Sequence, residues 1–183
     1  MSPWLFPIIA VLVAASGAVT DLRNGRIPNK LTFPTMLVGL TGHSVAHGMF
    51  GTLESLAGIL ICAAVPGIVY KASQGNGIGG GDIKLFAALG ALLGPMQGLE
   101  VELSAFLLLG LFAMFRLAYL GQLGRTLIGS FRVTAGLLAP KLRQSQALES
   151  ATMTSMRMGP AIAVAVLTVL SLPQLMRWVP WLG

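Results

Sequence analysis

The chain contains only two aspartates, Asp21 and Asp82, and each lies at the edge of a long apolar run. Asp21 ends the first of these runs and Asp82 precedes the fourth. If the runs cross a membrane, ionisable residues at this depth are costly and are functional-site candidates. Paired carboxylates would suit aspartic proteolysis, in which one ionised acid takes a proton from water and the other, protonated, polarises the scissile carbonyl. Two neighbouring carboxylates do not readily ionise together, so such a pair would share one proton.

A purely structural role is the alternative for both acids. Each has a basic residue close by in the sequence, Arg23 near Asp21 and Lys84 near Asp82, and could simply pair with such a residue. The charge pattern alone therefore leaves both interpretations open. The residues that surround each aspartate favour the catalytic one.

Asp21 opens the segment Asp-Leu-Arg-Asn-Gly-Arg-Ile-Pro-Asn (21–29), and Asp82 follows three glycines (79–81) and precedes Lys84 by two positions. These segments resemble the paired motifs of the type IV prepilin peptidase family, which are integral-membrane aspartic peptidases of the GxGD class. That family combines a D…R…IPN segment after its first helix with a second aspartate in a GxGDxK motif. Either segment alone is only suggestive, but together and in this order they are specific.

The resemblance, which covers residues 5–120 better than the rest, implies a function. Such a protein would be an aspartic endopeptidase that cleaves the leader peptide from prepilins or pseudopilins at the cytoplasmic face of the bacterial inner membrane. Asp21 and Asp82 would be the catalytic pair that activates water. Longer family members carry an insertion with CxxC motifs and also methylate the product. This chain shows neither the insertion nor the CxxC motifs. It resembles the short form of the peptidase that is associated with Flp-type pili, so we expect cleavage without methylation.

Seven further residues are expected to shape the site or bind substrate there: Gly79, Gly80, Gly81, Lys84, Arg23, Pro28 and Asn29. The glycines would let an extended substrate lie against the turn beside Asp82. Pro28 would fix a rigid turn, and Asn29 is available to cap the next helix. Lys84 would not share a helix face with Asp82, so we expect it to reach lipid headgroups or an acidic substrate.

The composition indicates a membrane protein. Of the 183 residues, 55% are hydrophobic and 10% charged, and the mean hydropathy is +0.80. A soluble domain has about a quarter charged residues, and a disordered chain would not keep so much apolar surface in water. Apolar runs of roughly spanning length occur at residues 3–20, 31–50, 53–70, 83–99, 101–120 and 158–176. We therefore expect a single domain (1–183) that is all-α and polytopic, with about six transmembrane helices.

Basic residues alternate between the connections and predict the orientation. The first, third and fifth connections carry Lys and Arg, whereas the second and fourth do not. Because basic loops stay in the cytoplasm, both termini should face outward and both aspartates should lie near the cytoplasmic side. The net charge of +6 follows from this pattern, and no aromatic-rich basic patch points to nucleic acid as a partner. The expected partners are the lipid bilayer and a prepilin, and the oligomeric state is open.

The fifth connection (121–157) has two interpretations of similar weight. Apolar residues recur in it at helical spacing, which would suit a helix lying in the membrane interface, but a solvated loop is equally compatible. Within the apolar runs, Gly90 and Gly94 form a GxxxG pair that would allow close approach of a neighbouring backbone. Cys62 is expected to be a small buried hydrophobic residue.

His43 and His47 stand four residues apart, a spacing that can place two imidazoles on one metal ion. Only Glu54 is placed to supply a third ligand, and all three lie far from the aspartates. Interfacial histidines are the interpretation that the sequence favours, so we expect neither a metal nor a cofactor.

Two other functions have to be weighed against a peptidase. A small transporter coupled to protons or ions would use aspartates nearer the bilayer centre and often has repeated halves, and the sequence shows neither. A non-catalytic pilus assembly factor would bind pilins without cutting them, and such a binder has no need of an intact aspartate pair.

Overall fold

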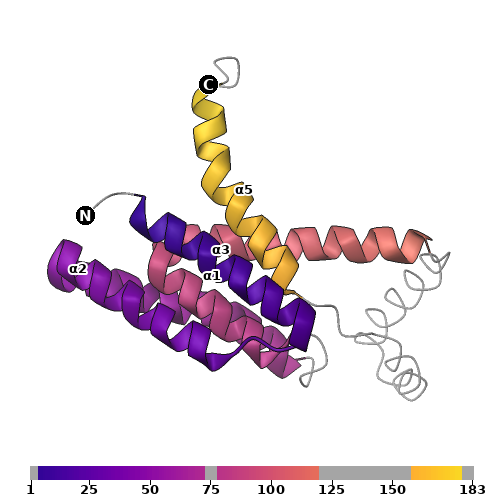
Figure 1. Cartoon of the computed structure of the whole chain (residues 1–183), viewed down its shortest axis with the longest axis horizontal. Coiled ribbons are helices and arrows are strands. Elements are labelled where there is room, and N and C mark those ends of the chain that lie inside the picture. The colour runs from indigo at the N-terminus through magenta and orange to yellow at the C-terminus, as the bar shows by residue number, and fades with distance from the viewer. Residues whose placement is uncertain (1–3, 73–77, 120–157, 179–183) are drawn as a thin grey trace, which may run out of the picture. The chain divides into compact units, whose positions relative to one another are not determined.

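The computed structural model of the chain describes residues 4–72, 78–119 and 158–178, with the side chains of 117 and 172–178 left aside. All of the regular structure in these ranges is helical: α1 (Leu5–Asn24), α2 (Asn29–Ala72), α3 (Gly80–Tyr119) and α5 (Gly159–Trp178), as drawn in Figure 1. The first three helices are long and apolar enough to cross a membrane. The all-α membrane architecture is therefore confirmed, while the connection 121–157 lies outside the described residues.

The chain divides into two compact units, which are described separately. One comprises residues 1–107 together with 157–183, and the other comprises residues 108–156. In the described ranges the second unit contributes only the last part of α3. All of the site residues discussed below belong to the first unit, and the expectation of a single domain stays a prediction.

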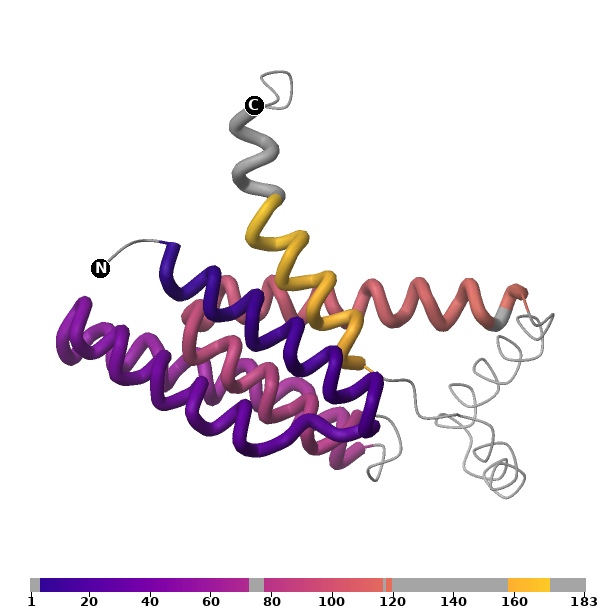
Figure 2. Tube along the Cα trace, in the orientation of Figure 1, coloured from indigo at the N-terminus to yellow at the C-terminus, as the bar shows by residue number. Residues whose placement is uncertain are grey.

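A glycine with positive φ interrupts both long helices, Gly48 in α2 (φ 62°) and Gly94 in α3 (φ 79°). A straight helix of 44 residues would be about 66 Å long, whereas the hydrocarbon core of a bilayer is about 30 Å thick. At Gly48 the chain instead turns back on itself, and Figure 2 shows the trace of α2 reversing its direction. The helices thus form six helical segments, but the number of crossings and the orientation stay predictions.

The turn in α3 falls earlier than the sequence suggested. We expected a connection near residue 100, between two apolar runs, but the helix is interrupted at Gly94 and resumes through Glu100 and Glu102. Gly94 adopts a left-handed φ and Pro95 follows it, which is a typical way to start a new helix. As a result Glu102 is fully buried, and its carboxylate oxygens have no hydrogen-bond partner within the described ranges.

The first arm of α3 forms the core of the larger unit, with residues 85–94 buried throughout. Both arms of α2 contact it. The Nε2 atom of His43 lies 2.9 Å from the carbonyl oxygen of Leu92, and the hydroxyl of Ser55 donates to the carbonyl of Ala91 at 2.9 Å. The first arm of α3 is therefore the element on which both arms of α2 are positioned.

Glycines allow α2 and α3 to approach each other very closely. A β-carbon placed on Gly58 would collide with the carbonyl of Gly90, and the reverse is also true. This confirms the close approach predicted at Gly90, whereas Gly94 forms the turn instead. Cys62 is fully buried, and its sulfur lies against the same stretch of α3, as expected of a small hydrophobic residue.

Helix α1 buries one stripe of mostly small residues. Its members are spaced three and four apart, as one face of a helix requires: Ala10, Val13, Ala14, Gly17, Ala18 and Asp21. Gly17 lies against the side chain of Leu85 in α3, and α1 also lies along α5. The helix ends at Gly25, whose N–H donates to the carbonyl of Asp21 at 2.8 Å. Because Asp21 is the last member of this stripe, the packing of α1 directs its carboxylate inward.

Candidate active site

The carboxylate of Asp21 is buried and hydrogen-bonded to the start of α5. Asp21 is 7% exposed, and its Oδ2 accepts the backbone N–H of Gly159 at 3.0 Å. Gly159 is the first residue of α5, so the positive end of that helix dipole faces the carboxylate. A β-carbon on Gly159 would lie 2.8 Å from the Cβ of Asp21, which leaves no room for any side chain.

Asp82 lies in the first turn of α3 and is 8% exposed. Its Oδ2 accepts the N–H of Gly79 at 3.1 Å, and its own N–H donates to the carbonyl of Gly79 at 3.0 Å. These reciprocal bonds close a tight turn at the start of the helix. The second carboxylate oxygen, Oδ1, is buried without a hydrogen-bond partner in the described part of the chain. One oxygen of Asp82 is thus fixed by the backbone while the other is left for a ligand.

The two sequence motifs meet at this end of the unit. A β-carbon on Gly81 would lie 3.1 Å from the Cβ of Ile27 and 3.3 Å from its amide nitrogen. The ammonium group of Lys84 donates to the side-chain oxygen of Asn29 at 2.9 Å. The carboxylates of Asp21 and Asp82 lie close enough for a coulombic interaction. Segments 55 residues apart in the sequence are thereby brought together near the two acids.

The predicted site-shaping residues occupy several different positions. Gly80 faces open space, and Pro28 directly precedes α2 and accepts the N–H of Leu31 at 3.0 Å. Arg23 is exposed in the last turn of α1. The expected cap at Asn29 is replaced by the bond to Lys84, whose ammonium also lies 5.8 Å from the centre of the Phe33 ring.

The structural alternative for the acids receives no support from these contacts. Among the described residues, neither aspartate forms an ion pair with Arg23 or Lys84. The hydrogen bonds to Asp21 and Asp82 come from backbone N–H groups instead, and Lys84 donates to Asn29. Buried carboxylates held by neutral donors keep their capacity to exchange protons with a ligand.

Sequence reasoning missed Gly159 as a site residue. The available signal was the pair Gly159-Pro160 at the start of the last apolar run, because proline at an early helical position marks a helix start. Nothing in the sequence related that start to Asp21, which is 138 residues away. The preceding Met158 is also buried, which anchors this end of α5 in the unit.

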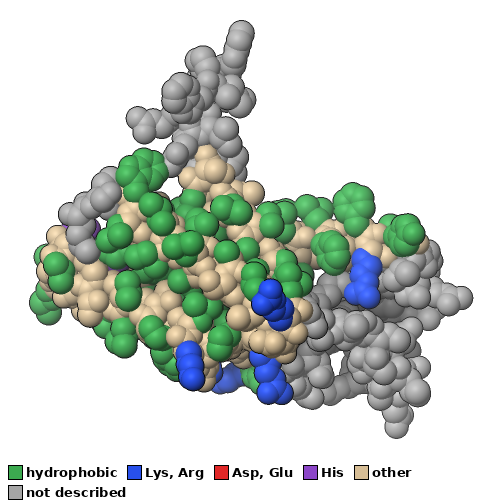
Figure 3. Space-filling view, viewed as in Figure 1, with side chains coloured by type: hydrophobic (Ala, Val, Ile, Leu, Met, Phe, Trp, Pro, Cys, Tyr) green, Lys and Arg blue, Asp and Glu red, His purple; other side chains and the backbone are tan. Residues whose placement is uncertain are grey.

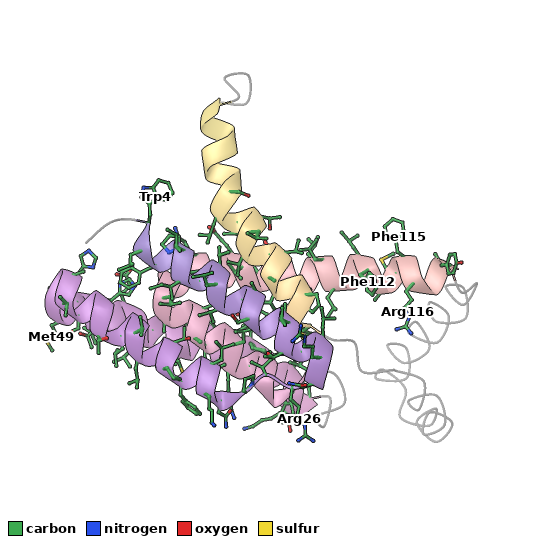
Figure 4. The ribbon with its side chains drawn as sticks, viewed as in Figure 1. Trp4, Arg26, Met49, Phe112, Phe115 and Arg116 are labelled. Carbon is green, nitrogen blue, oxygen red and sulfur yellow. The ribbon has the colours of Figure 1, made fainter. Side chains whose placement is uncertain are left out.

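The aspartates and the His residues lie at opposite ends of the first arm of α2, which runs from Asn29 to the Gly48 turn. Figure 4 labels Arg26, just before α2, at one end of the helical arrangement and Met49, just after the Gly48 turn, at the other. Figure 3 shows Lys and Arg side chains gathered near the connection between α1 and α2, while hydrophobic side chains cover much of the rest of that face. His43, His47 and Glu54, near Met49, form a group able to hold a metal ion in the described part of the chain.

The chain is thus an apolar helical protein with two buried aspartates in its larger unit. The model of the Type IV leader peptidase family matches residues 8–115, more than half of the chain. The chain belongs to this family of peptidases, and it is an integral membrane protein.

Several curated proteins are similar to this chain. A prepilin leader peptidase/N-methyltransferase of Burkholderia pseudomallei (strain 1026b) is 37% identical over 98 residues, which are 49% of this chain and 29% of that protein. The protein of that name from Bacillus subtilis (strain 168) is 33% identical over 94 residues, 49% of this chain and 36% of its own length. Prepilin peptidase EppA of Methanothermobacter thermautotrophicus is 36% identical over 94 residues, 49% of this chain and 23% of its own length.

The similar region thus spans little more than a third, at most, of these relatives' own length. No solved structure matches the chain.

Proposed function

We propose that this protein is an aspartic endopeptidase that removes the leader peptide of type IV prepilins or pseudopilins, of the Flp type, at the cytoplasmic face of the bacterial inner membrane. One observation carries the proposal. Two buried carboxylates from separate motifs, Asp21 and Asp82, lie at one end of the helices, each with an oxygen bound to a backbone N–H. We further propose six membrane crossings with both termini outside, in line with the alternation of basic connections.

In this mechanism the two carboxylates share one proton and activate a water molecule between them. The ionised acid takes a proton from the water as the water oxygen attacks the scissile carbonyl, and the protonated acid donates its proton to the carbonyl oxygen. The tetrahedral intermediate then collapses: the first acid returns its proton to the leaving amine as the C–N bond breaks, and the second takes back a proton from a hydroxyl of the intermediate, which restores the shared proton. The backbone bonds from Gly79 and Gly159 hold the acids in orientation without carrying charge. The buried, unpartnered Oδ1 of Asp82 is the atom best placed to bind the water.

The glycine run before Asp82 supplies the surface for the substrate backbone. Gly79 and Gly80 are exposed, and Gly80 has open space around its Cα. An extended segment between the leader and the apolar helix of a prepilin can lie against this turn and present its peptide bond to the acids. We expect cleavage without methylation, since the sequence shows no CxxC pair and its single cysteine, Cys62, is buried.

Processing of a co-expressed Flp-type prepilin by the wild-type protein and by Asp21→Asn and Asp82→Asn variants tests this function. General acid–base catalysis contributes about 10²–10⁴-fold, so each variant should lose at least about a hundredfold in cleavage rate. Glu100→Gln is the matched control, because it makes the same acid-to-amide change at an exposed position. Cleavage that persists in either Asn variant at the control's rate would eliminate the two-carboxylate mechanism.

A further inference from the structure

A second group of chemically active side chains lies at the Gly48 turn, at the far end of the first arm of α2 from the aspartates. His43, His47 and Glu54 each offer one ligand atom, and these atoms all lie within 4.8 Å of one another. His43 and His47 come from the arm before the turn and Glu54 from the arm after it. The turn is tight, because a β-carbon on Gly51 would collide with the carbonyl of His43.

Of the two nitrogens of the His43 ring, Nε2 forms a hydrogen bond and Nδ1 forms none within the described residues. Its Nε2 lies 2.9 Å from the carbonyl oxygen of Leu92, and a carbonyl can only accept, so Nε2 carries the hydrogen. The other nitrogen, Nδ1, therefore has a free lone pair in the neutral ring. It is buried without a hydrogen-bond partner in the described residues, in a side chain only 8% exposed. Histidines that bind metals show this pattern, because a second donor bond to a carbonyl fixes the ring and its tautomer.

Two contacts hold the imidazole ring of His43 in place, one with an aromatic ring and one with a backbone carbonyl. The Phe6 side chain of α1 stacks on it with a centroid distance of 4.5 Å and an interplanar angle of 10°. The Leu92 carbonyl belongs to the buried first arm of α3. The first ligand is therefore rigid before any ion arrives, which lowers the entropic cost of binding.

The other two ligands are accessible from outside. His47 and Glu54 are exposed, and the ring of His47 lies 6.1 Å from that of His43. The carboxylate of Glu54 lies against the Gly94 turn of α3, since a β-carbon on Gly94 would be 3.2 Å from the Oε1 atom of Glu54. An ion can thus reach the group from solvent, and exposed side chains can adjust around it.

We propose that His43, His47 and Glu54 bind a divalent transition-metal ion, with zinc as the best match to two imidazoles and a carboxylate, and with water at the fourth position. Zinc holds such ligands at about 2.0–2.2 Å, so His47 and Glu54 close around it towards the fixed Nδ1 of His43. The ion then links the two arms of α2 across the Gly48 turn. His47 is about 27 Å along the helix from Asn29, at 1.5 Å per residue, so the ion takes no part in peptide cleavage.

Zinc binding to the full-length protein in detergent, purified without a polyhistidine tag, tests the site. Isothermal titration should give one zinc ion per chain, and His47→Ala and Glu54→Gln should each weaken binding at least about tenfold, as loss of a ligand costs no less than loss of its supporting contacts. Glu100→Gln, an exposed acid outside the group, should bind zinc like the wild type. Absence of binding by the wild type, or equal binding by His47→Ala, would overturn the proposal.

Thermal unfolding provides a second measurement on the same proteins. His47 is exposed, so His47→Ala should fold and should have the melting temperature of the metal-free wild type. Zinc should raise the melting temperature of the wild type and of Glu100→Gln, and a chelator should reverse the rise. An equal zinc-dependent rise in His47→Ala would place the ion elsewhere and refute the site.

Discussion

The two ends of the first arm of α2, at Asn29 and at the Gly48 turn, are built in different ways. At the aspartate end, side chains and backbone from α1, α2, α3 and α5 converge, and the bond between Gly159 and Asp21 joins residues 138 positions apart. At the histidine end, the three candidate ligands come from residues 43–54, and one turn brings them together. An assembly of distant segments depends on the packing of the whole unit, whereas a local turn depends mainly on its own glycine. Substitutions should therefore be able to impair leader cleavage at the aspartate end without impairing zinc binding at the histidine end.

The largest effect is expected from Gly58→Ala, which lies between the two ends. The new β-carbon would collide with the carbonyl of Gly90, so α2 and α3 must move apart. Overpacking of this kind costs about 1–3 kcal/mol, and both leader cleavage and zinc binding should fall with the yield of folded protein. Thermal unfolding in detergent measures the loss, with Gly67→Ala as the control because its Cα has open space. If Gly58→Ala melts like Gly67→Ala, the close approach of these helices is not needed.

Gly159→Ala should affect the aspartate end alone. Its β-carbon would lie 2.8 Å from the Cβ of Asp21 and would push the start of α5 away from the carboxylate. Displacements of about 1 Å at a reacting group cost up to about a hundredfold, so cleavage should fall by about ten- to a hundredfold. Zinc binding should be unchanged, which distinguishes a local displacement from unfolding. A simultaneous loss of both activities would contradict the separation of the two ends.

A comparison of Gly81→Ala with Gly80→Ala tests whether the contact between the two motifs sets the position of Asp82. Gly81 lies against the backbone of Ile27, whereas Gly80, one residue earlier, has nothing within 4 Å of its β position. We expect a loss of about tenfold in cleavage for Gly81→Ala, about 1.4 kcal/mol, through displacement of Asp82, and a smaller loss for Gly80→Ala, whose methyl group would reach only the surface proposed for the substrate. Initial rates on the same prepilin measure both. Equal rates would mean that contact between the two motifs does not set the position of Asp82.

The smallest effect should come from Lys84→Gln and Asn29→Ala. Their hydrogen bond of 2.9 Å is exposed to solvent, and such bonds contribute about 0.5–1 kcal/mol. Each single substitution should lower cleavage about threefold or less, and the double variant should lose no more than either single one. Additive losses would show that the two side chains act separately, for example on substrate.

The sequence was sufficient for the parts of the molecule that repeat a simple pattern. Apolar runs of spanning length predicted the helices, and the two short motifs that the sequence singled out contact each other through Gly81 and Ile27 and through Lys84 and Asn29. The sequence favoured interfacial histidines over a metal site at His43 and His47 and named Glu54 as the available third ligand, and the structure brings these three groups together in the described ranges. Helical spacing and chain order are local properties, and the sequence expresses them directly.

The sequence was insufficient where tertiary contacts decide. The turn of α3 lies at Gly94, not near residue 100, and its signal is the local pair Gly94-Pro95, which the lengths of the apolar runs did not take into account. The side chain of Asn29 bonds to Lys84 rather than capping its helix, since the ammonium lies within reach only in the folded chain. The role of Gly159 also depends on the way α5 packs along α1, which no local pattern encodes.

The bond between Gly159 and Asp21 also has a consequence for synthesis. The acid appears near the start of the chain and its backbone donor near the end, so a nascent chain carries both aspartates long before it carries α5. On the proposed function, full peptidase activity therefore appears only after the ribosome has passed residue 159. An incomplete chain would lack one of the two backbone donors that hold the acids, so its activity is expected to be lower than that of the finished protein.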